Sequence, residues 1–310
     1  MKLKWFAGLF SLLIILLVMI YLILNPEKTE LNATLRKKLG GTYLSLSNGV
    51  THYRIDGPEN GQVVVLVHGG TVPSWCWDEQ IRALSGAGFK VLSYDKYGRG
   101  YSDRPDIVYD QKLYQKQLFE LVNKLGFTQP FNLIGVSLGG GTAVNFTANY
   151  PDRIRKLILI SPLIRNYKIS SLFRIPVFGE FMARVIGIRV ITDRFKSLYE
   201  GYPAEPDKYL KLFIEQTTYK GFQRSLLSMI RNDALGDYSS AYQAVGKQKR
   251  KILLIWGTAD SEITEVMINE IRDFIPDTKL IALEGVGHGI LTKQPDKINS
   301  FIINFLHKDN

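Results

Sequence analysis

The sequence predicts an α/β protein in which a mostly parallel sheet has helices on both faces, with an inserted helical cap and an N-terminal transmembrane helix. Three observations support this fold class. From about residue 42 onward, short runs of Val, Ile and Leu alternate with segments of helical character, a pattern typical of strands buried in a parallel sheet. One long stretch, between Ser161 and Lys251, contains no such run. At the N-terminus, the twenty consecutive residues from Trp5 to Leu24 have no charge.

The composition fits one large globular domain and indicates which classes of partner the protein could bind. The chain has 310 residues, of which 45% are hydrophobic, and its formal net charge of +10 is compatible with contact to an anionic surface. It contains no arginine-rich arm, zinc-finger spacing or aromatic signature of RNA binding, so we expect no nucleic-acid partner. Its one cysteine, Cys76, cannot form an internal disulfide.

The apolar stretch Trp5–Leu24 is long enough to cross a bilayer. At about 1.5 Å per residue, a helix of this length spans roughly 30 Å, the thickness of a hydrocarbon core. A cleaved signal peptide usually has a shorter apolar region and a cleavage site of small residues, and "MIYLILNPEK" offers no such site. We therefore expect an uncleaved membrane anchor at residues 1–26 and a linker at 27–41. A cleaved signal peptide and a buried core helix are the alternatives, and basic residues on both sides leave the orientation open.

Eight strands are predicted, of which the first two form a hairpin. The segment "TYLSLSNGVTHYRI" alternates polar and apolar residues around Asn48-Gly49, a strong signal for a tight turn. The six buried runs that follow are residues 63–67, 89–95, 131–136, 156–161, 251–257 and 279–284. Helical segments are predicted near residues 77–87, 110–125, 138–149, 263–274 and 295–307. A hairpin followed by βα repeats predicts a mostly parallel sheet that is covered by helices on both faces.

An insertion interrupts these repeats. About ninety residues between Ser161 and Lys251 have a helical pattern, and loops of that length without structure are uncommon. We therefore expect a helical cap at residues 163–247, inserted into a core that is made of residues 42–162 and 248–310. The cap contains 13 Lys and Arg against 8 Asp and Glu, which fits either a solvated basic surface or a lid that faces a membrane.

A serine stands at the junction of a predicted strand and a predicted helix. In "FNLIGVSLGGG", Ser137 follows the strand, and a serine on so sharp a turn presents its hydroxyl above the end of the sheet. Backbone segments approach closely there, so the neighbours must be small. Gly135 and Gly139 meet this demand, and Gly140 and Gly141 let the helix pack near the strand. The helix N-terminus also directs free amide groups at developing negative charge. We therefore interpret Ser137 as a nucleophile.

A serine hydroxyl is a poor nucleophile near neutral pH and needs a base. The chain has four histidines. His288 follows the predicted strand 279–284, at the edge of the sheet where Ser137 is expected, and is the best candidate. His52 lies in the predicted hairpin and His307 near the end of the chain, so both are expected at the surface.

The base in turn needs a carboxylate that orients it and stabilises its protonated form. Asp260 follows the predicted strand 251–257 at the same edge and is the best candidate acid. Glu262, two residues further along, is a weaker one. Asp95 also ends a predicted strand, but it precedes the nucleophile in the chain and is interpreted as structural.

Ser137, Asp260 and His288 occur in the chain order that is typical of α/β-hydrolases. The segments "VHGG", "YDKYGRGYSDRP", "GVSLGG", "LLIWGTAD" and "GVGHGI" resemble the landmarks of the α/β-hydrolase fold superfamily, in its lipase/esterase and meta-cleavage product hydrolase branch. The resemblance covers about residues 42–307. It implies an oxyanion hole made by the backbone N–H of Leu138 and that of Gly70, with Thr71 as the alternative. His68 is then expected to shape this loop.

The resulting expectation is a membrane-anchored serine hydrolase that cleaves carboxylic esters through an acyl-enzyme. A lipid-like substrate such as a monoacylglycerol is expected, with residues 5–24 in the membrane and no metal or organic cofactor. A C–C bond hydrolase of the meta-cleavage product type and a non-catalytic membrane protein of the same fold are the alternatives. Haloalkane dehalogenases and epoxide hydrolases of this fold need an aspartate at the position of Ser137, which argues against both.

Overall fold

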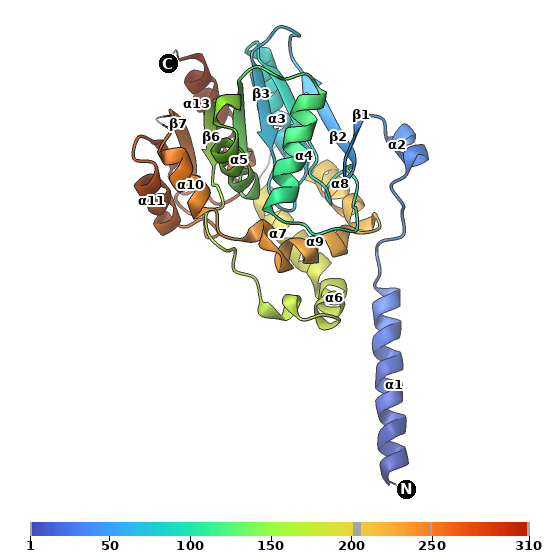
Figure 1. The fold of residues 1–310 in the computed structure, drawn as a ribbon. Coiled ribbons are helices and arrows are strands. Elements are labelled where there is room, and N and C mark those ends of the chain that lie inside the picture. The colour runs from blue at the N-terminus through green and yellow to red at the C-terminus, as the bar shows by residue number, and fades with distance from the viewer. Residues whose placement is uncertain (1, 201–205, 249, 309–310) are drawn as a thin grey trace.

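The centre of the molecule is an eight-stranded sheet (Figure 1). The structure is a computed structural model that describes residues 2–200, 206–248 and 250–308. The strands are β1 (Thr42–Leu46), β2 (Gly49–Asp56), β3 (Val63–Val67), β4 (Lys90–Tyr94), β5 (Phe131–Val136), β6 (Ile154–Ile160), β7 (Ile252–Gly257) and β8 (Lys279–Leu283). The predicted hairpin and all six predicted runs are confirmed within two residues.

The strands follow the order β1-β2-β4-β3-β5-β6-β7-β8. The pairs β1–β2 and β2–β4 are antiparallel, and all the other pairs are parallel. The carboxyl ends of β3, β5, β7 and β8 therefore meet at one edge of the sheet. Ligand sites of open α/β sheets lie outside this edge.

Helices cover both faces of the sheet because the side chains of each strand alternate in direction. Val65 and Val67 of β3 belong to one buried cluster, and Val64 and Leu66 belong to another. The first cluster includes side chains of α4 (Gln111–Lys124), α5 (Leu138–Asn149), α10 (Ser239–Gly246) and α11 (Glu265–Phe274). The second includes side chains of α3 (Asp78–Gly86), α12 (Ile290–Lys293) and α13 (Pro295–His307). The predicted doubly covered sheet is confirmed.

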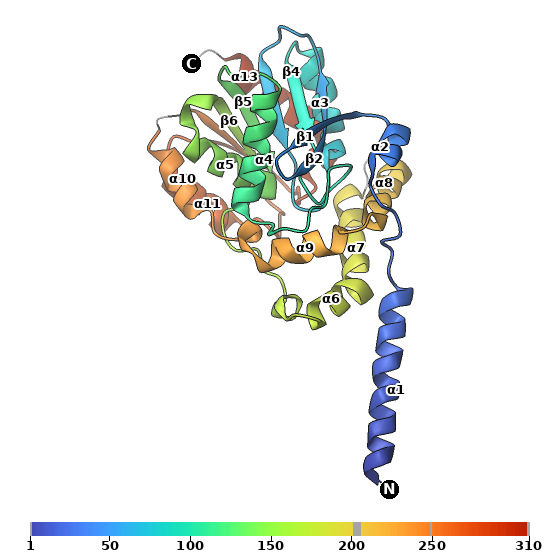
Figure 2. The same cartoon turned by 45° about the vertical axis from the view of Figure 1, so that its right-hand side comes forward.

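Helical segments between β6 and β7 lie beyond the carboxyl edge of the sheet, as Figures 1 and 2 show. They are a 3-10 turn (Ser171–Arg174), α6 (Phe178–Met182), a π-helical turn (Ala183–Gly187), α7 (Ile188–Tyr199), α8 (Pro206–Thr218) and α9 (Phe222–Arg231). The last helix of the predicted cap, α10, packs on the core, where Tyr242 and Val245 join the cluster around α5. Parts of the predicted units lie outside the described residues, namely Met1 of the anchor, residues 201–205 of the cap, and residues 249, 309 and 310 of the core.

The first helix, α1 (Lys2–Ile23), projects away from the rest of the molecule (Figures 1 and 2). Its segment Lys4–Ile23 has a mean hydropathy of 2.9 and is not buried, so α1 is long and apolar enough to cross a membrane. The segment that follows contains a short helix, α2 (Ala33–Leu39), which is capped by the side chain of Asn32. That segment was predicted only as a linker.

Candidate active site

Ser137 occupies the tight turn between β5 and α5. Its backbone has φ 54° and ψ −124°, and a positive φ is uncommon for residues other than glycine. The turn leaves no room for side chains beside it. A Cβ atom at Gly135 would lie 2.2 Å from the carbonyl oxygen of Gly139, and one at Gly139 would lie 2.0 Å from that of Val67. The need for small neighbours, inferred from the sequence, has this physical cause.

The side chains of Ser137, His288 and Asp260 meet in one row. Nδ1–H of His288 donates to Oδ2 of Asp260 over 2.8 Å, which leaves Nε2 to accept from the hydroxyl of Ser137 over 3.1 Å. Burial alone would raise the pKa of Asp260, but the adjacent His288 and the backbone amides of Glu262 and Ile263 together lower it. The carboxylate therefore stays ionised and holds the imidazole in the tautomer that a base requires.

Glu262, the weaker candidate acid, lies near the same histidine but does not take the place of Asp260. Its carboxylate receives two hydrogen bonds of 2.7 Å from Arg194 of α7, and its Oε2 lies 3.5 Å from Nε2 of His288. Arg194 also donates to the hydroxyl of Thr71 over 3.0 Å. No sequence pattern distinguishes Arg194, which is one of 13 basic residues in the predicted cap.

The two residues predicted for the oxyanion hole lie beside Ser137. Gly70 and Leu138 line the same cavity as the serine, and a Cβ atom at Gly70 would lie 3.6 Å from Cδ2 of Leu138. Two hydrogen bonds hold the loop that contains Gly70. In the first, Nε of Arg99 donates to the Gly70 carbonyl over 2.6 Å. In the second, the side chain of Gln216, which belongs to the cap helix α8, donates to the carbonyl of Thr71 over 2.9 Å.

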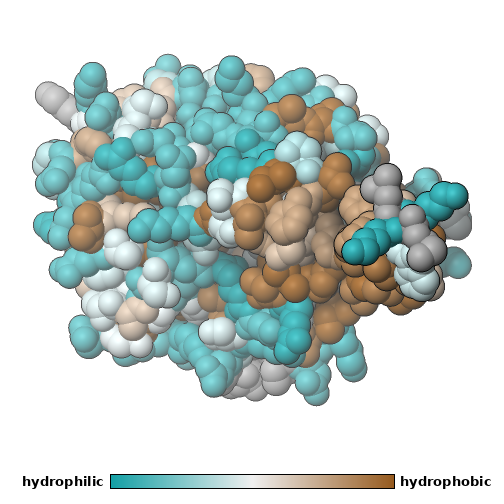
Figure 3. All heavy atoms as spheres, turned by 90° about the horizontal axis from the view of Figure 1, so that it is seen from below, coloured by the Kyte–Doolittle hydropathy of each residue, from teal (hydrophilic) through white to brown (hydrophobic). Residues whose placement is uncertain are grey.

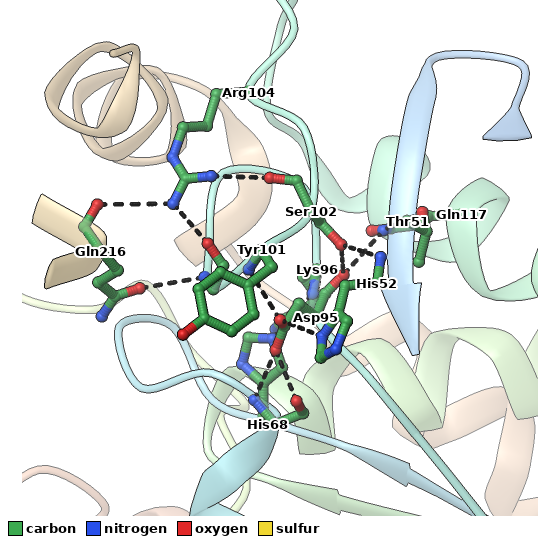
Figure 4. A network of polar contacts seen from close by, with 12 residues as sticks. Thr51, His52, His68, Asp95, Lys96, Tyr101, Ser102, Arg104, Gln117 and Gln216 are labelled. Atoms are coloured by element: carbon green, nitrogen blue, oxygen red, sulfur yellow. Dashed lines mark hydrogen bonds and ion pairs between the residues drawn. The ribbon is translucent and has the colours of Figure 1, made fainter. Parts of the chain in front are cut away.

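His68 and Asp95 form a buried polar network beneath this loop (Figure 4). Nδ1 of His68 donates to the carbonyl of Gly69, and Nε2 accepts from the amide of Lys96, both over 2.9 Å. Burial, together with the nearby Lys96, lowers the pKa of His68 to about 3, so the ring is neutral. Its contacts agree with the predicted role of shaping the loop.

The carboxylate of Asp95 accepts hydrogen bonds from four donors. They are Nδ1 of His52, the amide and hydroxyl of Ser74, and the amide of Tyr101. Burial would raise the pKa of Asp95, but these partners hold it well below its usual range. The prediction that His52 lies at the surface is wrong, because its side chain is 17% exposed and bound to Asp95. His307 is exposed, as predicted.

Two cavities meet at Ser137. The smaller one, of about 60 Å³, is lined by Gly69, Cys76 and His288 among others. The larger one, of about 360 Å³, extends between the sheet edge and the cap. Its walls are mainly apolar side chains of both parts, including Leu138, Leu163, Phe173, Ala183, Val190, Ile191, Leu226, Met229 and Ile230. Ser137 thus lies between a small cavity and a larger one, and apolar groups predominate in the lining of both.

Three curated relatives cover most of the chain at low identity. A non-heme chloroperoxidase of Streptomyces lividans is 23% identical, over 86% of this chain and 99% of that protein. A bifunctional esterase/perhydrolase of Acinetobacter calcoaceticus is 25% identical, over 85% and 99%. The carboxylesterase YbfK of Bacillus subtilis is 24% identical, over 85% and 86%.

Solved structures show the same fold. An enol-lactonase from Burkholderia xenovorans superposes with a TM-score of 0.72 at 23% identity, over 86% of this chain and all of that one. A meta-cleavage product hydrolase from Pseudomonas fluorescens has a TM-score of 0.67 at 24% identity, over 87% and 98%. A membrane phospholipase A described as a bacterial virulence factor has a TM-score of 0.71 at 19% identity, over 99% and 98%.

A comparison with protein families matches most of the chain to one family. The model described as alpha/beta hydrolase fold matches residues 62–295, a range that begins just before β3 and ends at the start of α13. This range contains Ser137, Asp260 and His288. The chain therefore belongs to the alpha/beta hydrolase fold family.

Proposed function

We propose that this protein is a membrane-anchored serine hydrolase that cleaves carboxylic esters of apolar acids. The observation that carries the proposal is the row of hydrogen bonds from Ser137 through His288 to Asp260, of 3.1 Å and 2.8 Å. A hydroxyl, an imidazole and a carboxylate in this arrangement are the components of nucleophilic acyl transfer.

In the proposed reaction, Oγ of Ser137 attacks the ester carbonyl carbon while Nε2 of His288 takes the hydroxyl proton. The amides of Gly70 and Leu138 stabilise the negative oxygen of the tetrahedral intermediate. The C–O bond to the alcohol breaks as His288 returns the proton to the leaving oxygen. A water molecule, activated by His288, then attacks the acyl-enzyme and releases the acid, and Asp260 remains ionised throughout.

The larger cavity supports an apolar acyl group as the part of the substrate that is bound. Its 360 Å³ and its aliphatic and aromatic walls suit a hydrocarbon chain that reaches the serine at one end. Lipid esters such as monoacylglycerols or phospholipids have such chains. A membrane phospholipase A is among the proteins with this fold, and its likeness extends over 99% of the chain, α1 included.

Membrane anchoring through α1 is supported by its contacts with the cap. Tyr21 lies under the guanidinium of Arg184, 4.3 Å from the ring centroid, and its hydroxyl accepts from Arg184 over 3.3 Å. Glu27, four residues after α1, accepts a 2.9 Å hydrogen bond from the amide of Gly221. These contacts hold the end of α1 against the folded domain. A signal peptide is removed after export and has no need of such contacts, so they favour an α1 that is retained as an anchor.

The test of the nucleophile uses the detergent-solubilised full chain and a fluorophosphonate probe. We expect the parent protein to be labelled and Ser137→Ala to be unlabelled. Ser261→Ala, which alters the serine next to Asp260 in the chain, is the control and should keep its label.

A series of esters of increasing acyl length then tests the substrate class, and we expect kcat/KM to rise with chain length. Unchanged labelling of Ser137→Ala refutes the mechanism, and hydrolysis of short esters alone refutes the lipid substrate.

A C–C bond hydrolase is the second candidate, because a meta-cleavage product hydrolase has the same fold over 87% of the chain. Such an enzyme uses the same three residues on a vinylogous diketone. Turnover of that compound without turnover of any ester would favour it. A protein of this fold that has lost catalysis would react with neither substrate nor probe.

A further inference from the structure

The cap presents a group of apolar side chains to the outside of the molecule. They lie on the 3-10 turn before α6, on α6 and around the start of α7. We call them the cap patch, which consists of Leu172 (44% exposed), Ile175 (48%), Val177 (81%), Phe178 (42%), Ile186 (38%) and Val190 (56%). Contiguous apolar surface of this kind marks an interaction site more often than a solvated face.

The cap patch lies on the side of the molecule from which α1 projects. In both Figure 1 and Figure 2, α6 lies at the end of the globular part nearest to α1 and at the level where α1 ends. Seen along α1 in Figure 3, hydrophobic residues extend from this helix across the adjoining surface. A bilayer that α1 spans would therefore meet α6 at its surface.

Specific contacts fix the cap relative to the end of α1. The guanidinium of Arg184, which follows α6, stacks on the aromatic ring of Tyr21 in a cation–π contact. The amides of Gly221 and Gln223, at the start of α9, both donate to the carboxylate of Glu27. Thr29 then pairs by backbone hydrogen bonds with the segment that joins α8 and α9. One attachment from α1 and two from the segment that follows it therefore set the position of the cap relative to the end of α1.

The charge around the cap patch suits lipid headgroups. Residues 168–190 contain four basic side chains, Lys168, Arg174, Arg184 and Arg189, and one acidic side chain, Glu180. An interfacial segment typically combines apolar residues with Lys and Arg, because the basic groups remain at the level of anionic headgroups while the apolar groups enter the acyl region.

The large cavity opens beside the cap patch. Val190 belongs to the patch, is 56% exposed and also lines the cavity that reaches Ser137. Lys168 and Ser170 are exposed and line the same cavity. These three residues reach both the cavity and the outer surface, and we call them the mouth of the cavity.

We propose that the cap patch is inserted into the leaflet at which α1 ends, and that acyl chains enter the cavity directly from the bilayer through the mouth at Lys168, Ser170 and Val190. This inference rests on the proposed function, because it assigns the route by which a lipid ester reaches Ser137. The partner is the lipid surface itself, with a preference for anionic headgroups.

The insertion is tested with two variants of the full chain, each with one added cysteine, in vesicles of phosphatidylcholine and phosphatidylglycerol. Val177→Cys, in the patch, and Val266→Cys, on α11, replace valines that are 81% and 77% exposed. Each is labelled with an environment-sensitive dye, and the signal of the parent chain, which contains only Cys76, is subtracted. We expect nitroxide-bearing phospholipids to quench the dye at position 177 and not at position 266. Equal quenching at both positions overturns the proposal. So does a dye at position 177 that is shielded from water but is not quenched by lipid, which is the result that self-association would produce.

The entry route is tested by activity with Val177→Glu and the matched control Val266→Glu, neither of which lines the cavity. We expect Val177→Glu to lower kcat/KM for a long-chain ester presented in vesicles by about tenfold, because a carboxylate must then enter the interface. Both variants should hydrolyse a short soluble ester like the parent. Equal vesicle activity of the two variants overturns the route. A parent that cleaves no ester at all refutes the proposed function instead, so the two failures are distinguishable.

Discussion

Oε2 of Glu262 lies 3.5 Å from Nε2 of His288, the same nitrogen that lies 3.1 Å from the hydroxyl of Ser137. A second carboxylate thus lies near this imidazole, on the side that faces Ser137. Burial acts to raise the pKa of Glu262, but Arg194 and the nearby His288 together lower it. Arg194 belongs to the cap helix α7, so the cap determines how much of this negative charge the imidazole experiences.

Removing the arginine should make the base harder to deprotonate. In Arg194→Gln, the carboxylate of Glu262 loses its two hydrogen bonds and turns toward protonated His288. Because only the neutral imidazole can accept the proton of Ser137, we expect the acid limb of the pH profile of kcat/KM to move to higher pH, by about one unit. The profile is measured with a short soluble ester.

The double variant Arg194→Gln/Glu262→Gln is the control for this effect. It lacks the freed carboxylate, so we expect its acid limb to return to the position in the parent even if its overall activity is lower. A merely structural role of Arg194 would lower activity at all pH values and leave the limb where it is. An identical limb in the single and double variants would contradict the prediction.

Replacement of Asp260 by asparagine should separate geometry from charge. The amide can occupy the same volume, but it removes the ionised acceptor that holds Nδ1–H of His288. We expect kcat for ester hydrolysis to fall by about 10³ to 10⁴. As a control for folding, the circular dichroism spectrum at neutral pH should remain that of the parent. An activity within tenfold of that of the parent would mean that another carboxylate has the role given to Asp260, and Glu262 is then the first candidate.

The buried neutral His68 should make the fold less stable at acidic pH. Its pKa is lowered to about 3 in the folded state, whereas the unfolded value is about 6.5. Between these values the unfolded chain binds more protons, so the free energy of unfolding decreases as the pH falls, by up to about 1.4 kcal/mol per unit from this residue. Asp95, whose pKa is lowered, adds its own loss only below about pH 3.9.

Urea unfolding in detergent between about pH 6 and pH 4.5 measures this slope. His68→Gln should have a shallower slope than the parent, even if it is less stable at every pH. His307→Gln alters an exposed histidine and should keep the parental slope. Parallel curves for His68→Gln and the parent would show that His68 does not contribute.

The tight turn at the nucleophile should not tolerate a methyl group. A Cβ atom at Gly139 would lie 2.0 Å from the backbone oxygen of Val67, so Gly139→Ala must displace β3 or α5, and we expect a loss of about 3 kcal/mol or more. Gly86, near the end of α3, has no atom within 4 Å of such a position, and Gly86→Ala should be neutral or stabilising by up to about 1 kcal/mol. Thermal unfolding of the two variants compares them directly.

The positions of the three central residues could be predicted because each directly follows its own strand. β5, β7 and β8 are buried Val, Ile and Leu runs that are recognisable from composition alone, and parallel strands bring their carboxyl ends to one edge. Ser137, Asp260 and His288 follow those runs by one to five residues. Short connections left little freedom for any of them to lie elsewhere.

The surroundings of the site depend on contacts between distant parts of the chain, which the sequence pattern does not encode. His52 was expected at the surface because it lies in the predicted hairpin, but the pairing of Tyr53 with Tyr94 brings it against Asp95. Helical periodicity likewise predicts that α7 buries one face, but it does not indicate that Arg194 meets Glu262. Such pairs are fixed by tertiary packing.

The sheet order gives the nucleophile and the base unequal support. β5 lies between β3 and β6, whereas β8 is the last strand of the sheet and, among the described residues, pairs with β7 alone. The loop of His288 is attached to its neighbour through Ala259–Val286 and Thr258–Gly285 hydrogen bonds. On warming, the imidazole should therefore move away from the hydroxyl before the central strands separate. The proposed ester hydrolysis should then be lost at a temperature where the circular dichroism is still that of the intact fold.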